Sequence, residues 1–192
     1  MDDVLGFWTL SPVVAGVIAL LIAAVFYVRV KGLPEGNEAM QRIAGYIRVG
    51  AMAFLMTEYK VLAVYTAVVF GLLTFAFSWQ SGAWFVLGAT LSLLAGFIGM
   101  KAATFGNVRT AQAASTGSKA NALLTALDGG AVMGLCVAGL ALIGLFAVYY
   151  VYPMGDVHQN AELASALHAF AVGASSIALF ARIGGGIYTK AA

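Results

Sequence analysis

The fold class is decided by one uncharged stretch, Gly130-Ala-Val-Met-Gly-Leu-Cys-Val-Ala-Gly-Leu-Ala-Leu-Ile-Gly-Leu-Phe-Ala-Val-Tyr-Tyr-Val-Tyr152. It is longer than the roughly 20 residues that a helix needs to cross the hydrocarbon of a bilayer. Its apolar residues follow one another without the alternation of barrel strands. The stretch therefore predicts a transmembrane α-helix and argues against a β-barrel.

Four further apolar stretches of similar length lie near residues 4–30, 55–79, 83–103 and 163–187. The chain of 192 residues is 62% hydrophobic and 9% charged, whereas ordinary soluble domains carry roughly 25% charged residues. A single soluble domain of this length could not bury so much apolar surface. We predict an all-α integral membrane protein with about five transmembrane helices, forming a single polytopic region over residues 1–192.

The placement of charge predicts the orientation. If the N-terminus lies outside, every Lys and Arg falls in an inner segment, and the outer segments keep only acidic and neutral residues. The ten cations are Arg29, Lys31, Arg42, Arg48, Lys60, Lys101, Arg109, Lys119, Arg182 and Lys190. Because cytoplasmic loops carry the excess of Lys and Arg, we predict an outside N-terminus and a cytoplasmic C-terminus.

Several classes of protein are excluded. A net charge of +2 without a clustered basic face argues against nucleic-acid binding. The single cysteine, Cys136, excludes an internal disulfide, and the two histidines do not stand at metal-ligand spacing. Asp2 and Asp3 open the chain without a basic region, so the first stretch is predicted to be a retained helix and not a cleaved signal peptide.

The connections carry further signals. The linker Lys31-Gly-Leu-Pro-Glu-Gly36 ends the first helix, and Asn37 is predicted to cap a second helix that continues unbroken into the second span. Its start is either an interfacial segment or a protruding helix. Its predicted apolar face comprises Ile43, Ile47, Ala51, Phe54 and Leu55. We expect an outer turn at residues 80–82 and a polar inner connection at residues 110–121.

Small residues are concentrated in the fourth span, where Gly130 and Gly134 form a GxxxG pair. Such pairs let a neighbouring helix approach closely, and plain packing is favoured here over a ligand site. Asp128 is predicted to sit at the start of this helix as a solvated capping acid. Cys136 is predicted to be a small buried apolar residue.

The fifth span carries a polar stripe, because His168, Ser175, Arg182 and Thr189 recur every seven residues and share one helical face. Such a stripe should face the bundle interior or a watery cavity. Glycines at 184–186 separate Arg182 from Lys190, which lies about 12 Å further along a helix. The alternatives are an interfacial, snorkelling role for Arg182 and an ordinary inner-flank role for Lys190.

Four sequence motifs are similar to the N-terminal part of the membrane-bound, ion-pumping inorganic pyrophosphatases. They are Ile47-Arg-Val-Gly-Ala-Met-Ala-Phe-Leu55 with Glu58-Tyr-Lys60, Gly106-Asn-Val-Arg-Thr-Ala111, Gly129-Gly-Ala-Val-Met-Gly-Leu135, and Leu179-Phe-Ala-Arg-Ile-Gly-Gly-Gly-Ile-Tyr-Thr-Lys-Ala-Ala192. The last motif, over residues 179–192, is the most specific of the four. The resemblance covers nearly the whole chain but only the first third or quarter of a family member.

The resemblance implies a homodimer with sixteen transmembrane helices per subunit, located in the cell membrane if the source is prokaryotic. It implies hydrolysis of pyrophosphate at the cytoplasmic face, coupled to outward transport of H⁺ or Na⁺. Lys190 matches the family lysine that contacts pyrophosphate, and Arg182 matches the arginine linked to the ion gate. Mg²⁺ is the implied cofactor, and the resemblance leaves open whether K⁺ is also needed.

The chain departs from the family pattern at its end, because it stops before the aspartates that follow Thr-Lys-Ala-Ala and hold Mg²⁺. No catalytic residue and no metal ligand is therefore assigned within it, and this segment alone is expected to be inactive. The alternative function is a non-catalytic five-helix membrane scaffold or a small permease subunit.

Overall fold

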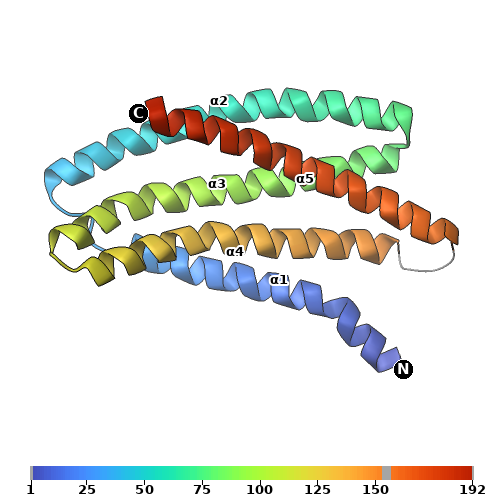
Figure 1. Ribbon diagram of the computed structural model, residues 1–192, viewed down its shortest axis with the longest axis horizontal. Helices are drawn as coiled ribbons and strands as arrows, with labels where there is room; N and C mark the ends of the chain where they lie inside the picture. The colour runs from blue at the N-terminus through green and yellow to red at the C-terminus, as the bar shows by residue number, and fades with distance from the viewer. Residues whose placement is uncertain (1, 153–156, 192) are drawn as a thin grey trace.

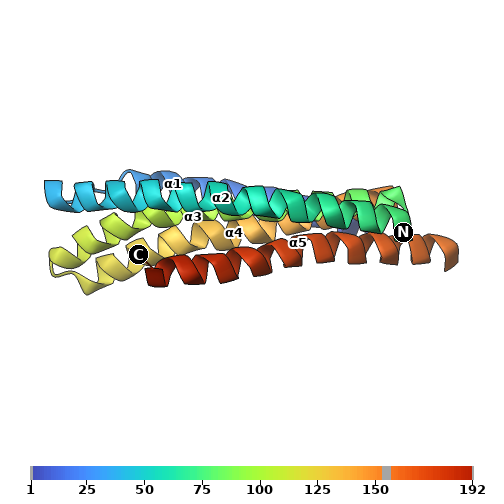
Figure 2. The same cartoon turned by 90° about the horizontal axis from the view of Figure 1, so that it is seen from above.

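The computed structural model describes residues 2–152 and 157–191, and the side chains of residues 10–152 and 160–186. It contains five α-helices, namely α1 (Asp2–Lys31), α2 (Glu38–Ala76), α3 (Trp79–Ser115), α4 (Lys119–Val151) and α5 (Val157–Ala191). No strand occurs in this part of the chain. All five helices are long and apolar enough to cross a membrane, which confirms the predicted fold class. They run along one long axis, as Figures 1 and 2 show.

Helix α3 is the central element, because it contacts each of the other four helices. Helix α4 packs between α3 and α1, whereas α2 and α5 lie against α3. The buried residues between the helices are mostly small or β-branched, as in the cluster of Ala23, Ala102, Val132 and Cys136. Cys136 is 3% exposed, which confirms its predicted burial.

The helices are longer than the predicted spans, so two connections are shorter than expected. The predicted inner connection at residues 110–121 is wrong, since α3 continues to Ser115 and only residues 116–118 separate it from α4. The alanines in this segment favour helix, and Ser118 caps α4 by accepting a hydrogen bond from the Asn121 amide. The outer turn likewise lies at residues 77–78, because Ser78 caps α3.

Helix α2 begins where the sequence predicted. The Asn37 side chain accepts a hydrogen bond of 2.9 Å from the Met40 amide, and the helix then runs unbroken for 39 residues. At 1.5 Å per residue this is about 58 Å, roughly twice the thickness of the hydrocarbon. The length favours a helix that protrudes beyond the membrane over a short interfacial segment.

The predicted packing face of α2 is only partly right. Ala51 and Leu55 are buried as expected, but Ile43 and Ile47 are 56% and 41% exposed, and Ala44 is buried instead. A small alanine side chain at a buried position lets two helices lie close together, whereas a large isoleucine there would hold the two backbones apart.

Two helix crossings depend on pairs of glycines. A Cβ atom added to Gly88 of α3 would collide with the Phe170 carbonyl oxygen, and one added to Gly173 of α5 would collide with the Phe85 carbonyl oxygen. At the crossing of α1 and α4, a Cβ on Gly16 would lie 2.8 Å from the Gly139 oxygen. These backbones are therefore in direct contact, which only glycine permits.

The predicted GxxxG pair is not one of these crossings. A Cβ atom added to Gly130 or Gly134 would meet nothing within 4 Å, and both residues are exposed. The neighbouring Gly129 faces α3 instead, since a Cβ atom added to it would lie 3.8 Å from the Cα atom of Gly106. A motif in the sequence does not specify which side of a helix meets its partner. Here the face with Gly130 and the face with Gly129 are one residue apart, which is a rotation of about 100° around the helix.

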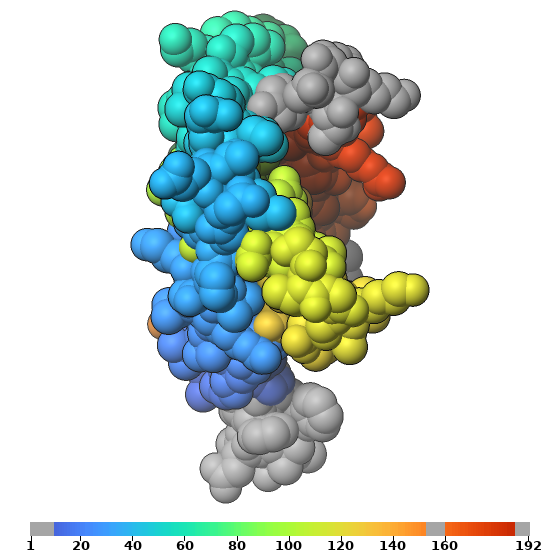
Figure 3. Space-filling view, turned by 90° about the vertical axis from the view of Figure 1, so that its left-hand side faces the viewer, coloured from blue at the N-terminus to red at the C-terminus, as the bar shows by residue number. Residues whose placement is uncertain are grey.

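The ends of α1, α3 and α5 and the starts of α2 and α4 lie toward one end of the bundle (Figure 1). Most of the basic residues belong to these helix ends, among them Arg29, Lys31, Arg42, Arg109 and Lys119. Seen from that end, the α1–α2 connection lies beside the α3–α4 connection (Figure 3). This gathering follows from the predicted charge asymmetry, and it supports the proposed orientation with these basic ends in the cytoplasm.

The orientation gives a direct labelling prediction. In a Cys136→Ser background, a cysteine at exposed Gln80 should react with an impermeant thiol reagent from outside intact cells, and a cysteine at exposed Ser115 should not. In inverted membrane vesicles the result should reverse, because these positions lie at opposite ends of α3. Labelling of Ser115→Cys from outside would overturn the proposed topology.

Candidate functional site

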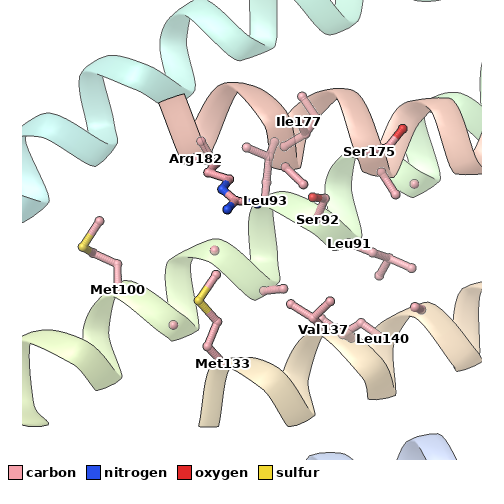
Figure 4. Close-up of a pocket in the computed structure, with 18 of the residues that line it drawn as sticks. Leu91, Ser92, Leu93, Met100, Met133, Val137, Leu140, Ser175, Ile177 and Arg182 are labelled. Carbon is pink, nitrogen blue, oxygen red and sulfur yellow. The ribbon is translucent and has the colours of Figure 1, made fainter. Parts of the chain in front are cut away.

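A cavity of about 680 Å³ lies among α2, α3, α4 and α5. Its wall is mainly apolar, with residues such as Leu91, Val137 and Leu140 (Figure 4). A small group of polar side chains also lines it: Glu58 and Tyr59 from α2, Ser92 from α3, and Ser175 and Arg182 from α5. An apolar cavity with few polar groups is typical of a functional site in a membrane bundle.

Two residues of the predicted polar stripe line this cavity. They are Ser175 and Arg182, and in Figure 4 the Arg182 side chain extends from α5 toward α3. His168 does not line it, since that side chain is exposed and its Nδ1 atom lies 2.6 Å from the Ala164 carbonyl oxygen of its own helix. Thr189 belongs to the stripe by spacing, but its side chain lies outside the described residues.

Helix α5 brings Arg182 to the cavity because its crossing with α3 is fixed at Gly173 and Gly88, about two and a half turns away. Arg182 lies 22 residues after Asn160, the first residue of the candidate span, or about 33 Å along the helix, which is close to the 30 Å thickness of a hydrocarbon layer. Among the described side chains no ion pair joins Arg182 to a carboxylate.

The glycine run after Arg182 is helical, and α5 continues without a break to Ala191. The separation of about 12 Å between Arg182 and Lys190 therefore holds along one straight element. The Lys190 side chain itself lies outside the described residues. A Cβ atom added to Gly184 would lie 2.6 Å from Glu58 Oε1, whereas one added to Gly185 would meet nothing within 4 Å. Glu58 of α2 thus lies against the glycine run at Gly184, whereas no described residue packs against the run at Gly185.

Asp128 is not the capping acid that the sequence predicted. Helix α4 begins at Lys119, so Asp128 lies nine residues inside it, and Arg29 Nε lies 3.4 Å from Asp128 Oδ2. The Asp128 side chain is 13% exposed and the Arg29 side chain 61%. The pair joins α4 to the end of α1, and its contribution to stability is modest because one partner is well solvated.

Arg109 is the structural residue that sequence reasoning missed. It is 4% exposed, and its guanidinium donates to the carbonyl oxygens of Lys31, Leu33 and Phe105 at 2.7, 3.0 and 2.9 Å. A fourth hydrogen bond of 2.8 Å reaches Glu35 Oε1. Arg109 therefore fastens the α1–α2 connection to α3. A buried arginine needs such a set of acceptors, because an unpaired buried charge is very costly.

A signal for this burial was present in the sequence. Ala95, Ala102 and Arg109 recur every seven residues, so they share one face of α3, and all three are at most 4% exposed. Arg48 adds to the same cluster, since its guanidinium carbon lies 4.4 Å from the centre of the Phe105 ring. This distance is typical of a cation–π contact.

Loss of the Arg109 clamp, the set of hydrogen bonds from Arg109 to the α1–α2 connection, should destabilise the bundle. Arg109→Ala should lower the free energy of unfolding by roughly 2 kcal/mol, because buried carbonyls and Glu35 lose a charged partner. Arg109→Lys should lose less, since it keeps the charge but not the planar fork. Thermal unfolding in detergent can be followed by reaction of the buried Cys136 thiol with a fluorogenic dye. Lys119→Ala, at an exposed position, is the control, and equal stability of Arg109→Ala would contradict the clamp.

The described residues do not form a magnesium site. Within them, no group of three or more His, Cys, Asp or Glu side chains lies close enough to hold a metal ion. The carboxylates of Asp128 and Glu35 instead form ion pairs with Arg29 and Arg109.

The fold and the cavity define a polytopic α-helical integral membrane protein whose cavity is lined by the ionisable side chains of Glu58 and Arg182, among others. The family described as inorganic H⁺ pyrophosphatase matches residues 17–192. This match covers most of the chain, and the chain belongs to that family.

Two relatives show what the chain is similar to. A K⁺-stimulated pyrophosphate-energized sodium pump of Thermotoga maritima is 44% identical over 189 residues, which cover 91% of this chain and 26% of the relative. A K⁺-insensitive pyrophosphate-energized proton pump of Methanosarcina mazei is 42% identical over 180 residues, covering 93% of this chain and 25% of that relative. The chain spans about a quarter of the length of the curated relatives that it matches.

Proposed function

We propose that this chain forms the N-terminal membrane part of a pump that couples hydrolysis of pyrophosphate in the cytoplasm to outward transport of H⁺ or Na⁺. The observation that carries the proposal is the unbroken helix α5, which holds Arg182 at the cavity and Lys190 about 12 Å further toward the basic end. Its relatives act on pyrophosphate and move Na⁺ or H⁺ according to their names.

The two cations of α5 have separate roles in this proposal. Lys190, at the cytoplasmic mouth, binds the pyrophosphate polyanion through charge-assisted hydrogen bonds. Arg182, near the inner boundary of the membrane, acts on the transported ion, because a fixed positive charge changes the ion occupancy of nearby carboxylates. One rigid helix thus connects the substrate end to the transport end.

Mg²⁺ as the cofactor and a homodimeric assembly belong to the proposal as well, and the proposal leaves open whether K⁺ is needed. Mg²⁺ neutralises the phosphate charge during such hydrolysis when it is bound. The family resemblance supports a homodimer, and the name of the Thermotoga maritima relative includes K⁺ stimulation. The name of the Methanosarcina mazei relative includes K⁺ insensitivity, so relatives of both kinds are similar to this chain.

The proposal predicts that the 192-residue chain alone is inactive. Purified in detergent with Mg²⁺ and pyrophosphate, it should release no phosphate above the background of a protein-free sample, because its described carboxylates form no metal-binding group. Phosphate release by this chain would contradict the assignment of its sites.

The positive test uses a chimera, in which this chain replaces the matching quarter of the Thermotoga maritima pump. In sealed vesicles the chimera should release phosphate from pyrophosphate and take up ions. A chimera with normal membrane insertion but neither activity would contradict the proposal and favour the non-catalytic scaffold.

A further inference from the structure

Glu58 is a carboxylate on the inward face of α2. It stands three residues after Leu55 and four before Leu62, which are 3% and 2% exposed, so all three residues share one face. Lys60, two residues on, is exposed and points away from this face. Glu58 lies 18 residues before the end of α2, or about 27 Å, which places it near the inner membrane boundary, as Arg182 is.

The turn of α2 that carries Glu58 is held in place. The adjacent Tyr59 hydroxyl donates a hydrogen bond to the Leu93 carbonyl oxygen of α3. Tyr59 also packs with Leu62, Ala89 and Ile177, a cluster that joins α2, α3 and α5. Glu58 therefore occupies a fixed position beside the cavity, and it is not a side chain on a loosely attached helix.

Glu58 contacts α5 in the segment between the two site residues. A Cβ atom on Gly184 would lie 2.6 Å from Glu58 Oε1 and 3.1 Å from Phe54 Cζ, so a side chain at this position would displace the carboxylate or the ring. Gly184 lies between Arg182 and Lys190 in the sequence. Glu58 and Arg182 also line the same cavity, from different helices.

We propose that Glu58 is a positioning residue for the Arg182–Lys190 segment of α5, and that its negative charge is part of the coupling between hydrolysis and transport. The inference rests on the proposed function of α5. Ionisable residues on the inward face of a membrane helix commonly mark a substrate or ion pathway. The contact of Glu58 with the backbone at Gly184 holds α5 in place between Arg182, assigned to transport, and Lys190, assigned to substrate binding.

The position of Glu58 is tested on the 192-residue chain itself. In a Cys136→Ser background, the pair Glu58→Cys and Gly184→Cys should be joined by a short bifunctional thiol reagent. The pair Lys60→Cys and Gly184→Cys is the matched control, and it should not be joined because Lys60 faces away. Equal cross-linking of both pairs, or of neither, would overturn the inference independently of any activity.

The role of Glu58 is tested in the chimera. Glu58→Gln keeps the size of the side chain but removes its charge, and it should lower the number of ions transported per phosphate released by about threefold. Glu58→Asp should restore part of this ratio, whereas Lys60→Gln should leave it unchanged. A merely structural role would lower both rates together and leave the ratio constant, and that result would overturn the inference.

The two failures are distinguishable. If the unmodified chimera neither hydrolyses pyrophosphate nor transports ions, the proposed function fails and the role of Glu58 in coupling fails with it. If the unmodified chimera is active and Glu58→Gln has the same ratio, only the inference about Glu58 fails.

Discussion

The Gly173→Val variant is expected to separate α5 from α3. Even the Cβ atom of an added side chain would collide with the Phe85 carbonyl oxygen, and backbone atoms cannot move aside as a flexible side chain can. Forced overpacking should cost at least about 3 kcal/mol, the upper end of its usual range. Because α5 also carries Arg182, the variant should lose the cavity wall as well as stability.

The measurement is thermal unfolding in detergent, reported by the reactivity of the buried Cys136 thiol. Gly134→Val is the matched control, since a Cβ atom at that position would meet nothing within 4 Å. Its stability should stay within about 0.5 kcal/mol of the unmodified chain, as surface substitutions usually do. If Gly173→Val were as stable as Gly134→Val, the direct backbone contact between α3 and α5 would be wrong.

Substitutions of the two cations of α5 are expected to separate substrate binding from transport. In the chimera, Lys190→Ala should weaken pyrophosphate binding by about one to two decades, because a lost charge-assisted contact is worth roughly 1.5–3 kcal/mol. Arg182 lies about 12 Å away along the helix, too far to contact the same phosphate oxygens. Arg182→Ala should instead lower ion uptake by roughly tenfold, the range expected for coupling between distant sites.

Phosphate release and ion uptake are measured in the same sealed vesicles, so that each variant gives a ratio as well as two rates. Arg182→Lys keeps the charge and loses the planar fork, and it should retain part of the transport. Arg42→Ala, at an exposed position near the start of α2, is the control for the loss of a cation at the basic end. Unchanged uptake in Arg182→Ala would identify Arg182 as an interfacial flank and remove it from the transport path.

Much of the fold could be predicted from residue types alone. Five long apolar stretches predict five spanning helices, because only a helix satisfies its own backbone hydrogen bonds in lipid. The Asn37 cap and the break at residues 31–36 follow from local chemistry that needs no neighbour. The polar spacing in α5 agrees with the structure for Ser175 and Arg182, which line the cavity, but not for His168, which does not.

The sequence could not identify the packing faces of the helices. It favoured Gly130 and Gly134 as a contact, although the crossings lie at Gly139 and at the Gly88–Gly173 pair. In a soluble protein the apolar face of a helix is the buried face. In a membrane, lipid tails are as apolar as the protein interior, so hydropathy is similar on both sides of a helix and loses this information.

The sequence by itself determined the class of protein, the number of helices, the gathering of cations at one end and the family. Each depends on composition or on residues close together in the chain. Only the tertiary structure decided the clamp of Arg109 on the α1–α2 connection and the approach of Glu58 to Gly184. Both depend on residues more than 70 positions apart, which are brought together by close helix crossings that no local pattern encodes.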